Sequence, residues 1–245
     1  MNANAWRVEY VEELDSTNTV VADRARHGEG EGLVLRADHQ SQGRGRLGRS
    51  WEAASGSALL CSILVRPRLD SEHLQWAVVA VALSARAALG RLGVDCALKW
   101  PNDLLVGGEK VAGVLAEFVP TPSGPAIVVG LGVNVSDHPP HVDATDVARA
   151  RGKGTSVEEL LEGILDELGR RRPLLDTPHG LATLADEYRA ALVTIGQRVR
   201  VHERDGEWEG LAYDVDSAGH LLVHVDRGER TVVAGDVVHV RPVAS

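Results

Sequence analysis

The chain has 245 residues, of which 44% are hydrophobic and 25% are charged, so it can bury the core of one large domain or of one domain with a small appendage. Its formal net charge of −9 argues against general affinity for nucleic acid or anionic membrane, so any anion site must be local. No apolar run approaches the ~20 residues of a membrane span, no secretion signal begins the chain, and the two cysteines fit reduced core thiols, which together predict a cytoplasmic protein.

Strands and helices are expected from the N-terminus onward. Asp15 or Ser16 can cap a first helix and Gly28 can end it, while Ser71 and Gly93 are the matching signals for a long second helix. The expected elements are a strand over 6–14, a helix over 15–28, strands over 32–40 and 57–67, and a helix over 70–93.

Three further strands and two helices follow. A tight turn at Gly107-Gly108 divides the strand region 103–119, and Ser156 with Glu159 forms a capping box at a helix start. The elements are strands over 96–101, 103–119 and 124–135, a polar connection over 136–154, and helices over 155–171 and 177–192.

The pattern changes at about Thr194. From there apolar and polar residues alternate, and Asp-Gly, Ala-Gly and Arg-Gly turns interrupt them. This predicts about five short strands without a helix, which is typical of a small barrel. The sequence therefore predicts an α+β domain over residues 1–193 and a small β domain over 194–245.

The segment 41–51, SQGRGRLGRSW, has the glycine spacing of a dinucleotide-binding turn. A strand precedes it, but another strand follows directly and leaves no room for the helix that such a turn needs. A nucleic-acid surface would need a broad basic face with stacking aromatics, and only 4% of the residues are aromatic. Two interpretations remain: a solvated loop, or a mobile segment whose arginines close over a small anion. The residues concerned are Gly43, Arg44, Gly45, Arg46, Gly48, Arg49 and Trp51.

Other polar residues stand at strand ends. In KWPNDLL, residues 99–105, Pro101 fixes the backbone and presents an amide and a carboxylate together, although Asn102 and Asp103 could also cap their own turn. Lys110 follows the Gly-Gly turn and could equally be solvated, and Asn134 is a polar residue in a buried strand, which needs a partner.

Together these motifs resemble the biotin–protein ligases. The resemblance covers Asp15 to about Asn134 motif by motif, and the small C-terminal β domain matches the family's architecture. It rests on the order Ser16-Thr17-Asn18, Gln40, Gly43 to Trp51, Lys99 to Asp103, Lys110 with Gly113, and Gly130 to Asn134. One position departs from the family pattern GRGRRGR: Leu47 replaces an arginine.

The resemblance implies a class II synthetase-like fold, α+β, whose mixed and mostly antiparallel sheet is flanked by helices, with a small C-terminal SH3-like β-barrel. It implies an ATP-dependent ligase that activates biotin as biotinyl-5′-AMP and transfers it to a lysine of a biotin carboxyl carrier protein domain, with Mg²⁺ accompanying ATP. The alternatives are a lipoate–protein ligase or transferase of the same fold, and a catalytically weak biotin-binding module.

The resemblance also implies roles for single residues. Arg46, Asp103 and Lys110 are the expected catalytic residues, and no residue is expected to hold a resident metal. Val111, Leu115 and Trp51 are candidates for the wall beside the valeryl tail. Biotin or its adenylate is expected to contact Ser16, Thr17, Asn18, Gln40, Gly43, Arg44, Gly45, Arg46, Trp51, Lys110, Gly113 and Leu115. ATP is expected to contact Arg44, Lys99, Asn102, Asp103, Gly130 and Asn134.

Some family members also repress transcription through an N-terminal helix-turn-helix domain. Only fourteen residues precede Asp15, which is too few for that motif, so sequence-specific DNA binding is not expected. A monomer and a homodimer through a sheet edge both remain open.

Overall fold

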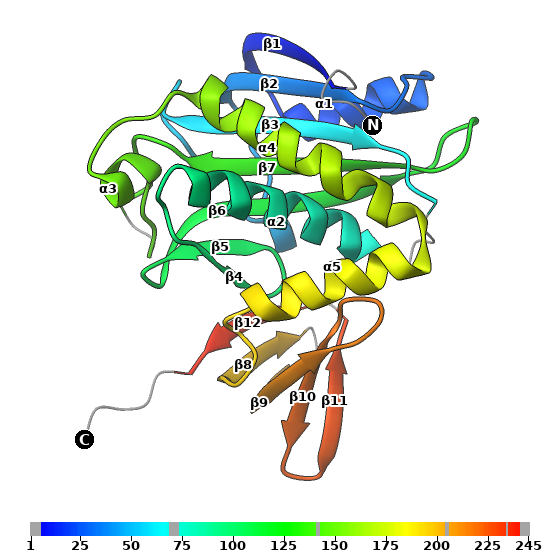
Figure 1. Cartoon of the computed structure of the whole chain (residues 1–245), viewed down its shortest axis with the longest axis vertical. Helices are drawn as coiled ribbons and strands as arrows, with labels where there is room; N and C mark the ends of the chain where they lie inside the picture. The colour runs from blue at the N-terminus through cyan, green and yellow to red at the C-terminus, as the bar shows by residue number, and fades with distance from the viewer. Residues whose placement is uncertain (1–5, 69–73, 141–142, 204–205, 234, 241–245) are drawn as a thin grey trace.

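The computed structural model describes residues 6–68, 74–140, 143–203, 206–233 and 235–240. A seven-stranded sheet forms the larger part of the molecule (Figure 1), and its first two strands pair in parallel while all other neighbours are antiparallel. The expected mixed, mostly antiparallel sheet is thereby confirmed. In spatial order its strands are β1 (Arg7–Leu14), β2 (Leu33–Gln40), β3 (Ala58–Val65), β7 (Ala126–Asn134), β6 (Glu109–Val119), β5 (Asp103–Val106) and β4 (Ala97–Lys99).

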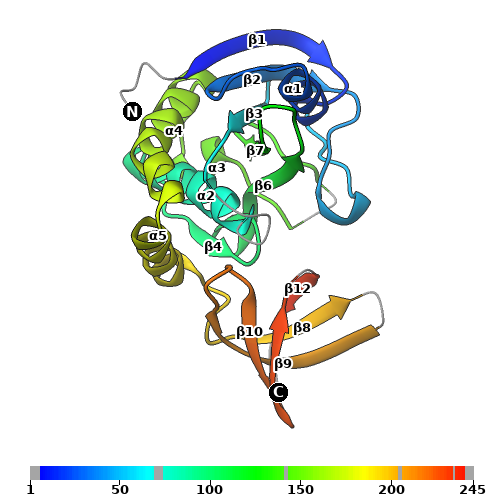
Figure 2. The same cartoon turned by 90° about the vertical axis from the view of Figure 1, so that its right-hand side faces the viewer.

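Helices cover both faces of this sheet (Figure 2). One face carries α2 (Leu74–Arg91), α4 (Val157–Arg171) and α5 (Pro178–Ala191), and the other carries α1 (Thr17–Arg26). Alternating strand residues divide between two buried clusters, so that Ile63 packs with the α2 side and Leu64 with the α1 side. The face under α1 is the one that positions the site described below.

Local signals account for most element ends. Ser156 Oγ accepts a hydrogen bond from the backbone N–H of Glu159 at 2.9 Å, which confirms the serine half of the predicted capping box, while the Glu159 carboxylate accepts from Thr155 Oγ1 at 3.2 Å. Gly107 and Gly108 both have positive φ in the two-residue turn from β5 to β6. Ser16 occupies the N-cap position of α1 but makes no side-chain cap bond. Ser71 lies outside the described residues.

The polar connection expected over 136–154 is not wholly irregular. It contains the short helix α3 (Val147–Arg151), and the Asp146 side chain caps it by accepting from the Arg149 N–H at 2.8 Å. Elsewhere in the described residues, 3₁₀ turns occur at Arg46–Gly48 and Arg172–Asp176. Such short pieces carry too little hydrophobic periodicity to be recognised in the sequence.

The five expected C-terminal strands form an antiparallel sheet in the order β11-β10-β9-β8-β12. This sheet packs against the part of the molecule that contains the seven-stranded sheet. Two hydrogen bonds join them: the indole of Trp76 donates to the Ser217 carbonyl at 2.9 Å, and that of Trp100 donates to the Gly219 carbonyl at 3.0 Å. One buried cluster continues through both sheets, and the domain division at residue 194 stays a prediction. The strands are β8 (Arg198–Glu203), β9 (Gly206–Val215), β10 (Leu221–Val225), β11 (Gly228–Val232) and β12 (Asp236–His239).

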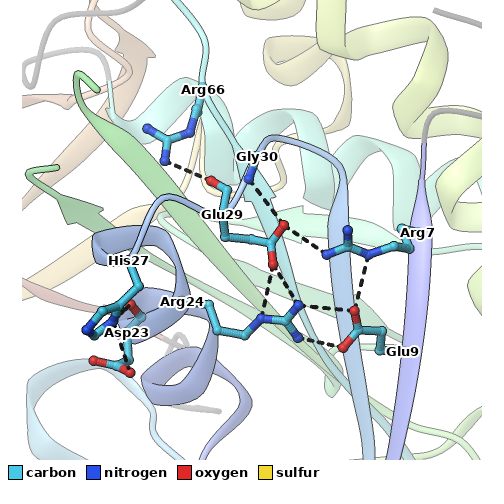
Figure 3. Close-up of polar contacts among 8 residues, drawn as sticks. All are labelled: Arg7, Glu9, Asp23, Arg24, His27, Glu29, Gly30 and Arg66. Carbon is cyan, nitrogen blue, oxygen red and sulfur yellow. Dashed lines mark hydrogen bonds and ion pairs between the residues drawn. The ribbon is translucent and has the colours of Figure 1, made fainter. Parts of the chain in front are cut away.

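A charge cluster fixes the C-terminal end of α1 (Figure 3). Arg24 pairs with Glu9 of β1 at 2.5 Å and with Glu29 at 2.6 Å, and Arg7 reaches Glu29 at 2.8 Å. Arg66 donates to the Glu29 carbonyl at 2.9 Å. Hydrogen bonding to Arg24 lowers the pKa of Glu9, and the pKa of Glu29 is lowered as well, because its bonds to Arg7 and Arg24 outweigh its burial. The cluster holds the helix whose other end enters the site.

Two further expectations concern chemistry and location. Both cysteines are free and buried, and burial raises the pKa of the Cys61 and Cys96 thiols to about 12, so they remain neutral thiols at physiological pH. Within the described ranges, every helix is too short or too polar to cross a membrane.

Candidate active site

One cavity lies between the α1 face of the sheet, the glycine- and arginine-rich segment 41–51 (hereafter the lid) and β12. Nearly all of the candidate residues line it, whereas Gly43, Val111 and Asn134 do not. Sequence reasoning did not find the contribution of the small sheet, which adds Gly235, Asp236 and Val237 to the wall. The candidates brought together are Ser16, Thr17, Asn18, Gln40, Arg44, Gly45, Arg46, Trp51, Lys99, Asn102, Asp103, Lys110, Gly113, Leu115 and Gly130.

The start of α1 forms a recess of short polar side chains at one end of the cavity. Ser16, Thr17 and Asn18 are all buried there. Gln40 Oε1 accepts from the Thr17 backbone N–H at 2.7 Å and lies 3.0 Å from Thr17 Oγ1. The Ser16 side chain makes no cap bond, so its hydroxyl can serve a ligand.

Two residues that the sequence interpretation missed support this recess. Ser62 of β3 is fully buried, and its Oγ lies 2.5 Å from Asn18 Oδ1 and 2.7 Å from Thr17 Oγ1. Glu117 of β6 accepts from Asn18 Nδ2 at 2.8 Å. A serine within the apolar run ALLCSILV was a usable signal, because a buried hydroxyl needs a partner.

Glycines in the sheet make room for side chains rather than for a ligand alone. Gly113 and Gly132 are paired across β6 and β7, and the Trp51 ring lies over both: a Cβ on Gly132 would lie 2.5 Å from Trp51 Cε2. Gly113 has Lys110 Nζ and the Trp51 ring above it, so the space over this glycine is occupied by those side chains. Gly130 lies beneath the Asn18 amide, whose Oδ1 would overlap with such a Cβ.

The lysine and the carboxylate predicted to be catalytic form an ion pair. Lys110 Nζ lies 2.6 Å from Asp103 Oδ1 and 5.4 Å from the centre of the Trp51 ring. Asn102 Nδ2 donates to the Val114 carbonyl at 2.7 Å, which leaves its Oδ1 as an acceptor.

Besides Gly43, two candidates do not line the cavity. Asn134 is buried, and its amide donates to the Thr145 carbonyl at 3.1 Å, so its place near ATP stays a prediction. Val111 is wholly buried in the core cluster that includes α2 and does not line the cavity. The expectation that Val111 contacts the valeryl tail is therefore wrong, because its strand position directs it into that core.

The three lid arginines have different surroundings. Arg44 pairs with Glu117 at 3.1 Å, and Arg49 pairs with Asp236 of β12. Arg46 has no hydrogen bond or ion pair with any described residue and lies 6.0 Å from the centre of the Trp100 ring. Burial lowers the pKa of Arg46, while the negative charges of Asp103 and Asp236 oppose that shift.

Leu47, the departure from the family pattern, lies between these arginines. Its φ of 55° and ψ of 34° place it in the left-handed region, and its side chain is 64% exposed. A leucine in this conformation is strained by about 1–2 kcal/mol. The lid therefore turns sharply at Leu47.

The small sheet also supports the KWPND strand end. The Trp100 backbone N–H donates to Thr194 Oγ1 at 3.0 Å, and His239 Nε2 lies 3.2 Å from the same oxygen. Burial lowers the pKa of His239, and the positive charge of Lys99 adds to this. Asn102 and Asp103 thus stand on backbone that both parts of the molecule fix.

Two hydrogen-bond donors at the cavity have no acceptor among the described residues. Trp51 Nε1 is buried, and no described residue accepts its hydrogen bond. Arg46 is likewise open to an anion. Within the described ranges, no group of three His, Cys, Asp or Glu residues is arranged to hold a metal ion. The cavity can therefore bind a polar ring at the end formed by the start of α1 and neutralise anions at the end formed by the cations.

Two family models match the chain. Residues 10–134 match the biotin/lipoate A/B protein ligase family, and residues 194–240 match the biotin protein ligase C-terminal domain.

Curated relatives and solved structures are similar over most of the chain. A biotin–[acetyl-CoA-carboxylase] ligase of Mycobacterium tuberculosis is 36% identical over 97% of this chain and 91% of its own length. A bifunctional ligase/repressor of Bacillus subtilis is 26% identical over 93% of this chain and 72% of its own. The biotin protein ligase of Aquifex aeolicus in complex with biotin and ATP superposes with a TM-score of 0.82 at 25% identity, covering 96% and 99% of the two chains.

Proposed function

The chain belongs to the biotin/lipoate A/B protein ligase family, and on that premise we propose how it works as an ATP-dependent biotin–protein ligase. One observation carries the proposal: a single cavity joins a recess of hydroxyls and amides to a group of cations. The ureido ring of biotin has two N–H donors and one carbonyl, which the recess of Ser16, Thr17, Asn18 and Gln40 can match. The carboxylate of biotin would then point toward Lys110 and Arg46.

In the first step the biotin carboxylate attacks the α-phosphate of ATP, giving biotinyl-5′-AMP and pyrophosphate. Two anions must approach each other, and Arg46, Lys110 and Lys99, which line the cavity, would neutralise them and the charge that develops at phosphorus. By analogy with oxyanion-hole donors, one such contact contributes ~3 kcal/mol to the transition state. Lys110 can turn from Asp103 to the substrate because its ammonium is attached to a flexible stem.

Mg²⁺ would accompany ATP rather than reside in the protein. This ion is usually held by one or two carboxylates together with substrate phosphates, and Asp103 with Asn102 Oδ1 fits that donor set. When bound, it would supply charge neutralisation at the triphosphate.

In the second step a lysine amine of the carrier domain attacks the mixed anhydride, giving an amide and AMP. The amine must first lose a proton, which costs roughly 4–5 kcal/mol at neutral pH for a pKa of about 10.4. Asp103 is the carboxylate proposed to orient the amine or accept that proton. The lid shields the anhydride from water meanwhile.

A lipoate ligase of the same fold is the second candidate. Lipoate has no ureido group, so the buried hydroxyls and amides of the recess would lose their partners, and a site that hydrogen-bonds its substrate discriminates strongly against analogues without those groups. The recess therefore favours biotin.

The direct test is incubation with biotin, Mg-ATP and an apo carrier domain, followed by intact-mass measurement. We expect the carrier to gain one biotinyl group only when ATP is present. Lipoate in place of biotin should leave the carrier mass unchanged, and transfer of lipoate instead would establish the other function.

We also propose that the acceptor is a carrier domain of a carboxylase and that the protein is cytoplasmic. Both a monomer and a homodimer are compatible with this proposal. The absence of sequence-specific DNA binding stays a prediction, and a gel-shift with biotin, ATP and a biotin-operon promoter tests it.

A further inference from the structure

A line of polar side chains runs from the recess to the lid. Gln40 Oε1, Thr17 Oγ1, Ser62 Oγ and Asn18 Oδ1 follow one another at 3.0, 2.7 and 2.5 Å. The other end of the Asn18 amide donates to Glu117 at 2.8 Å, and Glu117 also pairs with Arg44. Glu117 therefore ends the line on the side of the sheet, although neither it nor Ser62 lines the cavity.

Glu117 makes the shorter of the two contacts that set which way the Asn18 amide points. Carboxylate oxygens only accept hydrogen bonds, so the NH₂ group of Asn18 must face Glu117, and the Leu115 carbonyl accepts from the same group over a longer contact of 3.4 Å. The Asn18 carbonyl oxygen must then face Ser62, whose single proton is drawn to it over the 2.5 Å contact. Asn18 is only 4% exposed, so solvent offers no alternative orientation.

With the Asn18 amide in this orientation, the line has more oxygen–oxygen contacts than hydroxyl protons to fill them. Three oxygen–oxygen contacts link the four side chains, but of these four oxygens only the hydroxyls of Thr17 and Ser62 carry protons. The Ser62 proton goes to Asn18, and the Thr17 proton can serve either Ser62 or Gln40, not both. Gln40 Oε1 is fixed as an acceptor by the backbone N–H of Thr17. The recess therefore holds a surplus of acceptors.

We propose that Glu117 is a positioning residue that sets this surplus of acceptors, and that the surplus selects a ligand rich in N–H donors. This inference rests on the proposed function, in which that ligand is the ureido ring of biotin. A ligand N–H directed at Thr17, Asn18 or Gln40 supplies the missing proton. Without the Glu117 carboxylate the Asn18 amide can turn over and present its own N–H groups toward the recess, where they repel the ureido donors.

The test is a reciprocal exchange of the amide and the carboxylate. Glu117→Gln can turn either its carbonyl oxygen or its NH₂ group toward Asn18, so the acceptor-only partner that fixes the Asn18 amide is lost, and biotin binding measured by calorimetry is expected to weaken about tenfold. Asn18→Asp should weaken it similarly, because two carboxylates then face each other. In the double variant the new amide at position 117 can donate to the new carboxylate at position 18, so biotin should bind more tightly than to either single variant.

Controls separate this role from general damage. Glu162→Gln removes an exposed glutamate of α4 and should bind biotin as the wild type does. Arg44→Gln removes the lid partner of Glu117 but keeps the Asn18 orientation, so any loss of affinity should be equal for biotin and for a derivative methylated on a ureido nitrogen. Glu117→Gln should instead reduce the wild-type preference for biotin over that derivative, while the KM for ATP stays within about twofold.

Wild-type-like biotin binding by Glu117→Gln, or a double variant no better than the single ones, would overturn the inference. Should the variants fail to fold, ¹⁵N-asparagine labelling of the wild-type chain decides: protected Asn18 side-chain amide protons support it, and rapid exchange contradicts it. Carrier biotinylation by the wild-type chain is measured in parallel. Its failure would refute the proposed function, whereas unchanged Glu117→Gln beside an active wild type refutes only this inference.

Discussion

The three lid arginines differ in what surrounds them, and this difference suggests that they have different roles. Arg44 and Arg49 are each held by a carboxylate, at Glu117 and Asp236. Arg46 is more deeply placed, and no described residue pairs with it. A partly buried guanidinium without a partner is the group that gains most from an incoming anion, because much of its desolvation has already occurred.

Replacement of Arg46 by alanine should therefore release the adenylate. We expect both adenylate formation and its retention to fall by about 10²-fold, the usual effect of losing one charge-stabilising donor. The measurement is biotinyl-AMP found free in solution against that retained after gel filtration. Arg26→Ala, on the exposed side of α1, is the control that should retain adenylate normally. Unchanged retention by Arg46→Ala would contradict the role.

Besides its proposed place beside the Mg²⁺ of ATP in the first step, Asp103 should accept a proton in the second step, which can be measured separately by starting from biotinyl-AMP. Asp103→Asn keeps the shape of the side chain but removes its ability to accept a proton, so transfer from purified biotinyl-AMP to the carrier should slow by about 10²-fold. The rate is measured by rapid mixing of the purified adenylate and the variant with apo carrier domain. Transfer at the wild-type rate would exclude Asp103 as the proton acceptor.

Among single residues of the site, those that belong to compact motifs could be predicted from the sequence, whereas isolated ones could not. Asn18, Gln40 and Lys110 could be found because each stands in a recognisable segment. Glu117 could not, since a glutamate near the end of a strand is usually solvated and only the fold brings it to Asn18 and Arg44. Leu47 could be recognised as a departure but not as a residue with positive φ.

Among the elements, α1 supplies polar side chains of the recess at one end of the cavity. Its first turn supplies Thr17 and Asn18, and its last turn carries Arg24 in the charge cluster with Glu9 and Glu29 (Figure 3). Because the helix is short, its position depends on both ends being held. By holding the last turn of α1, the charge cluster therefore helps to position Thr17 and Asn18 at the other end of the helix.

The cluster should make stability depend on pH. The folded pKa values of Glu9 and Glu29 are lowered, so their contribution is present above the unfolded pKa of about 4.3 and is lost as the pH falls through the folded values. Arg24→Gln should lower the free energy of unfolding by about 1 kcal/mol at pH 7, and the difference from wild type should shrink below about pH 4.

Denaturant unfolding between about pH 3 and pH 7 measures this effect. Arg26→Gln removes the same charge from the same helix turn and should show no such pH dependence, since Arg26 is exposed. A constant difference between Arg24→Gln and wild type across the whole range would show that the carboxylates are not coupled to Arg24.

Element types were predictable along most of the chain because hydrophobic periodicity and caps agreed, as at Ser156. The helix α3 was missed because five residues give too short a period. The parallel pairing of β1 with β2 was not specified either, since pairing partners depend on which residues meet across the sheet and not on local pattern.

At the scale of the molecule, the small sheet is part of the site. Its β9–β10 turn accepts hydrogen bonds from Trp76 and Trp100, and β12 contributes Asp236 to the cavity wall. The sequence located this β region but could not show which of its edges faces the lid, because that depends on packing between distant segments.

The ion pair between Arg49 and Asp236 joins the lid to that sheet. Arg49→Asp and Asp236→Arg should each speed dissociation of the adenylate severalfold, and the double reversal should recover part of the loss. Both side chains are partly exposed, so the unfolding free energy should change by less than about 1 kcal/mol. Reversal of the exposed pair Arg198 and Glu209 is the control and should leave dissociation unchanged. Additive effects of the two lid-pair reversals would contradict a direct contact.

The central claim is that one cavity forms the adenylate and hands it to a carrier lysine. The most direct test mixes the protein with biotin and α-³²P-labelled Mg-ATP, removes free nucleotide, and then adds apo carrier domain. We expect labelled biotinyl-AMP to remain bound at about one per chain, and to be converted to AMP as the carrier becomes biotinylated. Formation of ADP, or a bound adenylate that the carrier does not consume, would contradict the account.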